Sequence, residues 1–191
     1  GVLNRLAGDG LLIRVAGKGT FVAPQKINAV SPVYKGIREQ LEVLGYDIAT
    51  TLISTERVPA PTRVREHLNL PAGAEVIAVI RLRTVDGKPL SVHRSFVPAS
   101  LAPGLDQLDV VNEQLCVVLE DKFNLSMKSV SEDLEVIVAE GTDAKLLELR
   151  KGDPALLLTD VITNPAGTAF EYSTIVFRGD TVRLKFDYKR E

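Results

Sequence analysis

The apolar positions of the first thirty residues predict a helix, a hairpin and an unpatterned stretch. Val2, Leu3 and Leu6 recur at helical spacing, and Gly10 follows as a helix stop. Two short apolar runs then flank a glycine-rich turn, which is typical of a hairpin. The predicted bounds are 1–9 for the helix, 11–15 and 20–23 for the strands, and 24–29 for a linker without periodicity.

From residue 31 onward the pattern changes to long strand-like runs with few helices. Ser31-Pro32 is an N-cap and first-turn signal for a helix that ends at Gly45. Long strands joined in hairpins predict an α+β fold, an antiparallel sheet with flanking helices. The other expected helices are 61–68, 112–123 and 142–149, and the expected strands are 48–58, 75–84, 89–97, 129–139, 155–163, 168–177 and 182–188.

One passage of the chain echoes another. The helix, turn and strand at 61–80 resemble those at 141–158. Two related half-units would explain the likeness, and so would chance, because similar helix-to-strand turns occur in many α+β domains.

The charge is low overall but uneven along the chain. The 191 residues carry 23 basic and 25 acidic side chains, and a net charge of -2 argues against a protein that binds nucleic acid over its whole surface. Residues 1–26, however, carry four basic side chains and one acidic one. Any contact with DNA is therefore expected to be local and close to the N-terminal hairpin.

The single cysteine and the lengths of the apolar runs indicate a cytoplasmic protein. Cys116 cannot form an internal disulfide and lies in the apolar run 115–119, so we expect a buried thiol in a reducing compartment. No run reaches the roughly 18 apolar residues that a membrane span needs. No basic-then-apolar leader opens the chain, and no membrane partner is expected.

Motifs for catalysis and metal binding are sparse. The chain has two histidines and no Cys or His cluster at metal-ligand spacing, so neither a metal nor a cofactor is expected. Gly17-Lys18-Gly19-Thr20 lacks the earlier glycine of a phosphate loop, because position 12 is Leu12. The carboxylates at 132, 133 and 135 alternate along one strand and are expected at the surface. An enzyme is not indicated.

Two arginines carry the strongest signal for binding. Alternation along 75–84 places Arg81 and Arg83 on one face of a strand. That face either meets water, which makes the arginines ordinary surface charge, or holds an anion, because paired guanidinium groups match carboxylate and phosphate oxygens.

The turn after this strand decides which residues join the arginines. A three-residue loop with Gly87 in the left-handed conformation would bring Ser91 and His93 to the same face, whereas a two-residue turn would send His93 to the other face. The sequence leaves both open. In the later strand Glu171, Ser173, Ile175 and Phe177 share a face, which suits either a ligand pocket or a core.

The segment 10–22 resembles the end of the winged helix of GntR-family transcription regulators. The likeness rests on Gly10-Leu11-Leu12-Ile13-Arg14 followed by Gly17-Lys18-Gly19-Thr20-Phe21-Val22. It implies that 1–26 are the helix tail and wing of a helix-turn-helix domain whose earlier part is missing, and that 27–30 are a linker. The implied DNA-binding residues of the wing are Arg14, Gly17, Lys18, Gly19 and Thr20, although this chain alone is expected to bind DNA poorly.

Residues 31–191 resemble the UTRA effector-binding domain of the HutC branch, which has a chorismate-lyase-like fold. The resemblance implies that an effector pocket is lined by Arg81, Arg83, His93, Glu171 and Phe177. Ser173 is added to this set because it shares a strand face with Glu171 and Phe177. The resemblance also favours the three-residue loop. The similar residues are Arg81-Leu82-Arg83, Asp86-Gly87-x-Pro89, Leu119-Glu120, Gly152-Asp153-Pro154 and Arg178-Gly179-Asp180.

The chain also departs from that pattern. Sugar-phosphate sensors of this branch often have Glu where this chain has His93 and Tyr where it has Phe177, and the small polar residues of the first helix are replaced around 35–37. A sugar phosphate is therefore doubtful, while an anionic metabolite remains expected because both arginines are present.

The resemblance implies a homodimeric repressor that leaves its operator DNA when a small anionic effector binds. A chorismate-lyase-like enzyme acting on a small dicarboxylate is the alternative. A dimerisation module with a vestigial pocket is a third possibility.

Overall fold

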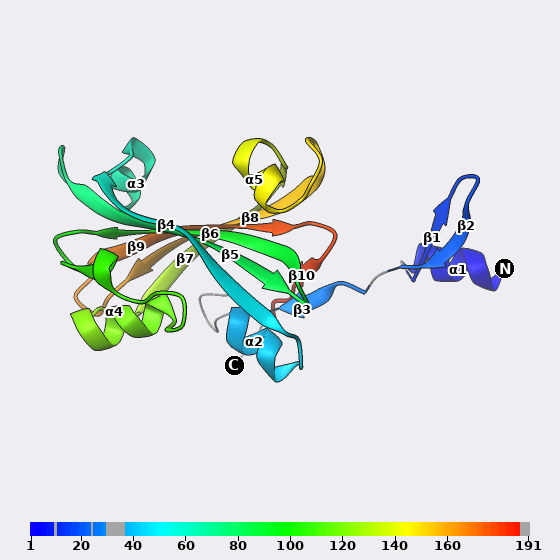
Figure 1. Cartoon of the computed structure of the whole chain (residues 1–191), viewed down its shortest axis with the longest axis horizontal. Coiled ribbons are helices and arrows are strands. Elements are labelled where there is room, and N and C mark those ends of the chain that lie inside the picture. The colour runs from blue at the N-terminus through cyan, green and yellow to red at the C-terminus, as the bar shows by residue number, and fades with distance from the viewer. Residues whose placement is uncertain (10, 24, 30–36, 188–191) are drawn as a thin grey trace.

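The computed structural model describes residues 1–9, 11–23, 25–29 and 37–187. The helix stop predicted at Gly10 and the N-cap predicted at Ser31-Pro32 lie outside these residues. At the N-terminus, α1 (Val2–Gly8) precedes a hairpin of β1 (Leu12–Val15) and β2 (Gly19–Val22), as the sequence predicted. Figure 1 shows this unit apart from the main sheet.

The main body is one antiparallel sheet of six strands in the order β4-β5-β6-β9-β8-β7. The predicted α+β class is confirmed. The strands are β4 (Ile48–Pro59), β5 (Glu75–Val85), β6 (Lys88–Pro98), β7 (Ser129–Val138), β8 (Pro154–Thr163) and β9 (Ala169–Arg178), and the helices are α2 (Ile37–Val43), α3 (Thr62–His67), the 3-10 turn η1 (Leu105–Gln107), α4 (Leu115–Phe123) and α5 (Gly141–Leu146).

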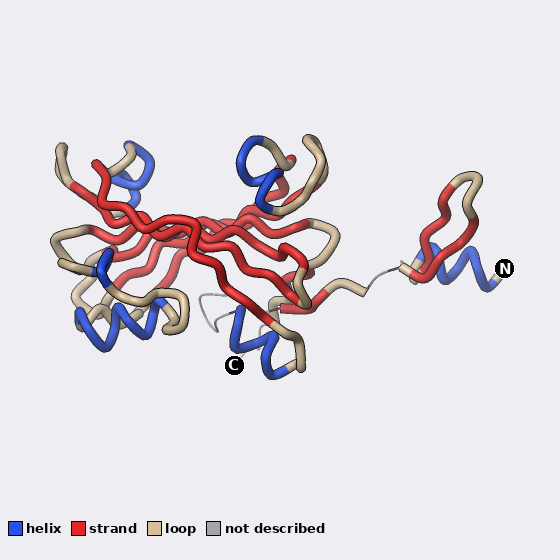
Figure 2. The backbone as a smooth tube through the Cα atoms, in the orientation of Figure 1, coloured by secondary structure: helices blue, strands red, loops and turns tan. Residues whose placement is uncertain are grey.

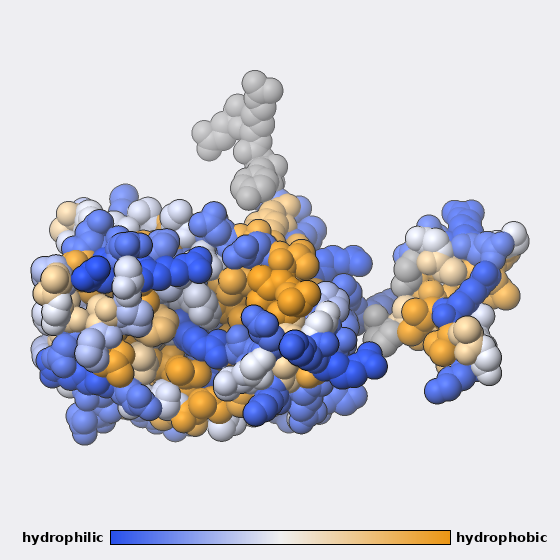
Figure 3. All heavy atoms as spheres, turned by 90° about the horizontal axis from the view of Figure 1, so that it is seen from above, coloured by the Kyte–Doolittle hydropathy of each residue, from blue (hydrophilic) through white to orange (hydrophobic). Residues whose placement is uncertain are grey.

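Helices cover both faces of the sheet (Figure 2). One face carries α2 and α4, each over its own apolar cluster. We call these the α4 cluster, which includes Ile77, Val79, Val97, Leu115, Leu119 and Ile162, and the α2 cluster, which includes Leu41, Val85, Leu90, Leu158, Ile175 and Phe177. The other face carries α3 and α5, and Figure 3 shows apolar side chains gathered over part of it, where Leu82, Leu146 and Leu157 are partly buried.

The sheet consists of two half-units with the same order of elements. Helix α2 is followed by β4, α3, β5 and β6, and helix α4 by β7, α5, β8 and β9. The same hydrogen bonds recur 79 residues apart: the Ala60 N–H donates to the Ala74 carbonyl, and the Ala139 N–H donates to the Asp153 carbonyl. The echo between 61–80 and 141–158 therefore reflects two half-units that fold alike, and β6 and β9 pair where they meet.

Two sequence-based expectations were wrong in detail. Residues Ile27–Ala29, expected to be a linker, form strand β3, which pairs in parallel with β10 (Val182–Leu184). The strand is stabilised because Ile27 and Ala29 are buried in the α2 cluster. Sequence patterns missed it because its partner strand is distant in the chain. Cys116, expected to be buried, is exposed, because α4 packs against the sheet through Leu115, Val118 and Leu119 instead.

Candidate functional site

A row of buried polar side chains crosses the sheet between the α4 cluster and the α2 cluster. On β5 the arginines lie between Val79 and Val85, and on β8 Asp160 lies between Ile162 and Leu158. Because residues paired across antiparallel strands project to the same face, all members share one side of the sheet. We call this row the polar belt: Arg81, Arg83, Ser91, His93, Ser95, Asp160, Glu171 and Ser173, each with at most 8% of its surface exposed.

The β5–β6 hairpin places His93 on the same face as the arginines through a combination of turn and bulge that the sequence did not reveal. Its turn has two residues, Asp86 and Gly87 at φ 49° and 77°, so the three-residue loop was wrong. A register shift after Pro89, however, leaves Leu90 as an extra residue in β6 and restores the pairing of Arg81 with His93. The predicted convergence therefore occurs, because the bulge reverses the change of face that the short turn introduces.

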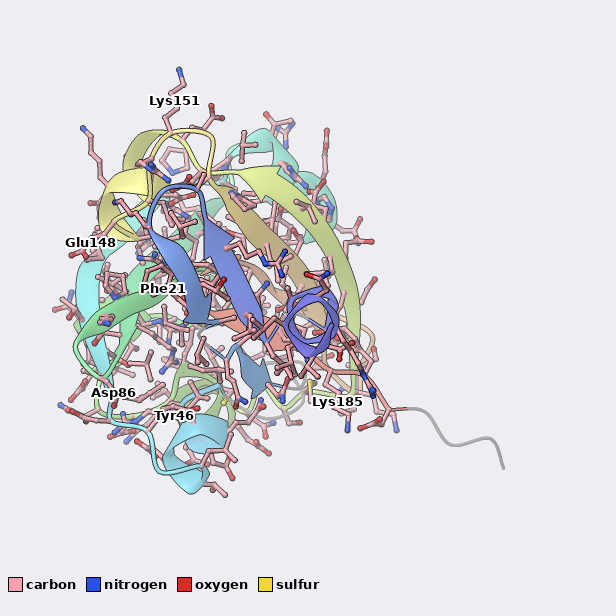
Figure 4. All side chains as sticks on the ribbon, turned by 90° about the vertical axis from the view of Figure 1, so that its right-hand side faces the viewer. Phe21, Tyr46, Asp86, Glu148, Lys151 and Lys185 are labelled. Atoms are coloured by element: carbon pink, nitrogen blue, oxygen red, sulfur yellow. The ribbon has the colours of Figure 1, made fainter. Side chains whose placement is uncertain are left out.

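Contacts with the preceding loop hold this turn in place. The Asp86 N–H donates to the Asp47 carbonyl over 2.8 Å, and the Asp47 N–H donates to the Asp86 carboxylate over 3.1 Å. Figure 4 shows Asp86 near Tyr46, on the side of the molecule that carries α2. The turn and the start of β4 therefore form one support for the arginine end of the belt.

The two arginines are buried with few partners. Arg81 donates from Nη2 to the Ser95 hydroxyl over 3.4 Å, and Arg83 donates from Nη1 to the Thr50 hydroxyl over 3.1 Å. The Nε atom of each is buried without a hydrogen-bond partner. Burial lowers the pKa of Arg81, and burial together with the neighbouring Arg81 charge lowers the pKa of Arg83 to about 10. Both shifts mark a place where positive charge is under-compensated.

His93 lies beside the arginines as a neutral ring. Burial, reinforced by the charges of Arg83 and Arg81, keeps its pKa well below the usual value. Its Nε2 atom is 2.8 Å from the Ser91 hydroxyl, and its ring forms a T-shaped pair with the ring of Phe177, with centroids 6.3 Å apart. Phe177 itself is fully buried in the α2 cluster and forms the apolar flank of the belt.

Glu171 links the arginine end of the belt to its acidic end. Burial raises the pKa of this carboxyl, while a hydrogen bond from the Ser95 hydroxyl and the charge of Arg81 lower it. Arg81, Ser95 and Glu171 thus form a chain of contacts from β5 through β6 to β9.

The acidic end, centred on Asp160, was not predicted. Asp160 is fully buried and accepts a hydrogen bond from the Ser173 hydroxyl over 3.2 Å at Oδ2, while its Oδ1 accepts from no N–H or hydroxyl donor. Burial and the nearby Glu132 raise the pKa of Asp160 to about 8, and the two carboxyls share a hydrogen bond. Glu132, expected to be surface decoration, therefore interacts with the belt. A lone Asp in the apolar run 155–162 was the available signal.

Arg38 of α2 adds a third guanidinium near this face. It donates to Glu42 over 2.8 Å and to the carbonyl of Val111 over 3.4 Å, and its charge contributes to the lowered pKa of Arg83. Of the neighbouring positions that the sequence singled out, Lys35, Gly36 and the side chain of Ile37 lie outside the described residues.

The N-terminal hairpin presents all of its predicted DNA-binding residues to solvent: Arg14, Gly17, Lys18, Gly19 and Thr20 are exposed. Gly17 and Gly19 have φ of 73° and 119°, which suits glycine and explains the tight tip. Arg14 also hydrogen-bonds with Asn4 of α1. The hairpin thus contacts α1 through Arg14, while its tip is exposed to solvent.

Within the ranges that the structure describes, no helix is long and apolar enough to cross a membrane. In the same ranges, no three His, Cys, Asp or Glu side chains are grouped as metal ligands.

Comparisons with known proteins match nearly the whole chain. The sequence profile of the UTRA domain matches residues 44–183. The probable fructoselysine utilization operon transcriptional repressor of Escherichia coli K12 is 27% identical over 98% of this chain and 77% of its own length. The histidine utilization repressor of Pseudomonas putida is 26% identical over 82% of this chain and 62% of its own length. The crystal structure of PhnF from Mycobacterium smegmatis has the same fold, with a TM-score of 0.83 and 22% identity over 99% of this chain and 83% of that one.

Proposed function

Since this chain belongs to the UTRA domain family, we propose that its polar belt binds a small anionic effector. The chain is part of a ligand-responsive transcription regulator of the GntR type, and its relatives include named repressors. The proposal adds the chemical class of the effector and the residues that hold it.

The pair of buried arginines carries this proposal. Two like charges buried side by side destabilise each other, and neither forms a salt bridge within 4.0 Å to a carboxylate among the described residues. Both retain an unpartnered Nε–H. An anion placed between Arg81 and Arg83 would accept these hydrogen bonds and offset the charge, so the protein gains more from binding an anion than a neutral molecule.

The other predicted residues complete the site by distinct roles. Neutral His93 offers a hydrogen bond without competing for the anion, and Phe177 supplies an apolar wall. Glu171 and Ser173 lie further along the belt, where they would orient the rest of the effector.

In the full regulator the exposed wing would contact operator DNA. The charged residues of the tip, Arg14 and Lys18, would pair with backbone phosphates, and the glycines would allow close approach. We infer a cytoplasmic homodimer in which the effector favours an arrangement of the two wings that no longer matches the operator half-sites. No catalytic role is assigned to the belt, and purified protein is expected not to turn over chorismate.

Thermal unfolding with and without anions tests the effector class. Phosphate, succinate and hexanoate at millimolar concentrations are the probes, and at least one is expected to raise the melting temperature. Arg83→Gln should abolish this rise. Arg57→Gln is the matched control, because Arg57 lies on the adjacent strand β4 and pairs with Glu75 at the surface. An undiminished rise in Arg83→Gln would overturn the proposal.

A further inference from the structure

We propose that the effector also carries a positively charged amine, which binds a second, acidic subsite formed by Asp160, Glu132 and Ser173. This inference rests on the proposed function, because it assigns the opposite end of the same ligand. It makes the effector a bipolar molecule rather than a simple anion.

The two half-units place the acidic subsite opposite the arginine site. Asp160 occupies in β8 the position that Arg81 occupies in β5, 79 residues earlier. Each is the first polar residue on its strand next to the α4 cluster, beside Ile162 and Val79 respectively. The fold therefore provides two equivalent positions about the central β6–β9 pair, and this sequence fills one with a cation and the other with an acid.

A missing partner at Asp160 indicates that something binds there. The side chain is fully buried, and Ser173 satisfies only one of its two carboxyl oxygens. The second oxygen, Oδ1, accepts no hydrogen bond from an N–H group or a hydroxyl, although a buried oxygen of this kind normally has such a donor. An ammonium group has three N–H donors and could bond this oxygen, the Glu132 carboxylate and the Ser173 hydroxyl together.

Charge selects an amine over a neutral donor. The groups that face Asp160 are Glu132 from β7 and Glu171 from β9, and both are carboxyls. Without a ligand, Asp160 and Glu132 share a hydrogen bond, which requires a proton on one of them. A bound ammonium would take the place of that proton, which leaves to the solvent, and the carboxylates would then gain a partner of opposite charge.

The distance across the belt sets the length of the ligand. Strand β5 and strand β8 are three strand spacings apart, or roughly 14 Å between backbones. The long arginine side chains shorten the gap between charged groups, but a simple α-amino acid has its charges only one carbon apart. The geometry instead suits a molecule whose anionic group and amine are separated by several bonds.

Three probes that differ only at one end test this inference: 6-aminohexanoate, 6-hydroxyhexanoate and hexanoate. Each is titrated into the full chain, with the melting temperature as the readout and the dissociation constant derived from it. We expect 6-aminohexanoate to bind about tenfold more tightly than hexanoate, which is the usual effect of one charge-assisted hydrogen bond. The hydroxyl compound should resemble hexanoate.

Matched variants assign the preference to the acidic subsite. Asp160→Asn keeps an acceptor for the Ser173 hydroxyl but removes the negative charge. The ratio of the dissociation constants of hexanoate and 6-aminohexanoate should therefore fall from about ten to about one. Asp133→Asn is the control, because Asp133 adjoins Glu132 but projects from the exposed opposite side of β7. This variant should keep the preference unchanged.

The outcomes separate the two proposals. If hexanoate binds and requires Arg83 but the amine adds nothing, the acidic subsite is refuted and the anion site stands. Equal gains from the amine and the hydroxyl compound would also refute it, as would an amine preference that survives Asp160→Asn. If none of the three probes raises the melting temperature, the acidic subsite is refuted. The anion site is refuted as well only if phosphate and succinate also give no rise that requires Arg83.

Discussion

The substitution Asp160→Asn should stabilise the protein relative to the wild type, and this gain in the free energy of unfolding should grow as the pH rises. In the folded chain, burial and the nearby Glu132 raise the pKa of Asp160 from 3.8 to about 8. The folded state therefore holds a proton between these values that the unfolded state has released. The contribution of this carboxyl to the free energy of unfolding is fully present below pH 4. It is lost as the pH increases toward 8, because more work is needed to keep the buried acid protonated.

The magnitude follows from the width of this interval. Each pH unit within it removes up to ~1.4 kcal/mol from the free energy of unfolding, so the wild type should lose about 3 kcal/mol between pH 5 and pH 7 through this group. An asparagine cannot ionise and is close in shape to the protonated acid. The variant should consequently lack this contribution and gain about 3 kcal/mol relative to the wild type over the same interval.

Urea unfolding followed by far-UV circular dichroism measures this difference, since the chain has no tryptophan to report by fluorescence. The free energies of wild type and variant are compared at pH 5, 6 and 7, with Asp133→Asn as the control for removing a surface charge. Parallel pH profiles for Asp160→Asn and the wild type would refute the reasoning, because they would mean that Asp160 titrates alike in both states.

Three further changes test the fold around the belt. Gly179→Ala should lower the free energy of unfolding by about 1–3 kcal/mol in urea, because a Cβ there would lie 2.6 Å from the Pro154 carbonyl oxygen; an unchanged midpoint would contradict this. Gly87→Ala should cost about 1 kcal/mol, since φ is 77° in the hairpin turn, and calorimetry would reveal a smaller loss if the turn is adaptable. Arg94→Gln removes a 2.5 Å salt bridge with Asp143 of α5, on the face of the sheet opposite the polar belt. It should leave the anion-induced rise in melting temperature unchanged; loss of that rise would mean that the two faces are coupled.

Local patterns were sufficient for most of the elements. The side-chain period of a strand is two residues, so the alternation along β5 already placed Arg81 and Arg83 on one face. Glycines marked the tip of the N-terminal hairpin, and the likeness between 61–80 and 141–158 anticipated the two half-units. Each of these features depends on residues close together in the chain.

The composition of the belt depended on contacts that no local pattern contains. The bulge at Leu90 decides whether His93 faces the arginines, and a shift of one residue would reverse that face. Likewise, Glu171 and Ser173 approach the arginine strand only because β9 pairs with β6 rather than with a strand nearer in sequence. Asp160 joins the belt only because β8 pairs with β9, and sequence patterns therefore missed it.

The sequence by itself determined most of the strands and helices, which side chains of one strand share a face, and that a basic hairpin precedes the part of the chain that resembles a UTRA domain. Only the tertiary structure decided how the strands are ordered, that 27–29 pair with 182–184, and that an acidic group lies across the sheet from the arginines. The physical reason is that alternation is imposed by the backbone of each strand alone. Strand order and register, in contrast, follow from burying apolar side chains of distant segments together, and that choice is made by the whole chain.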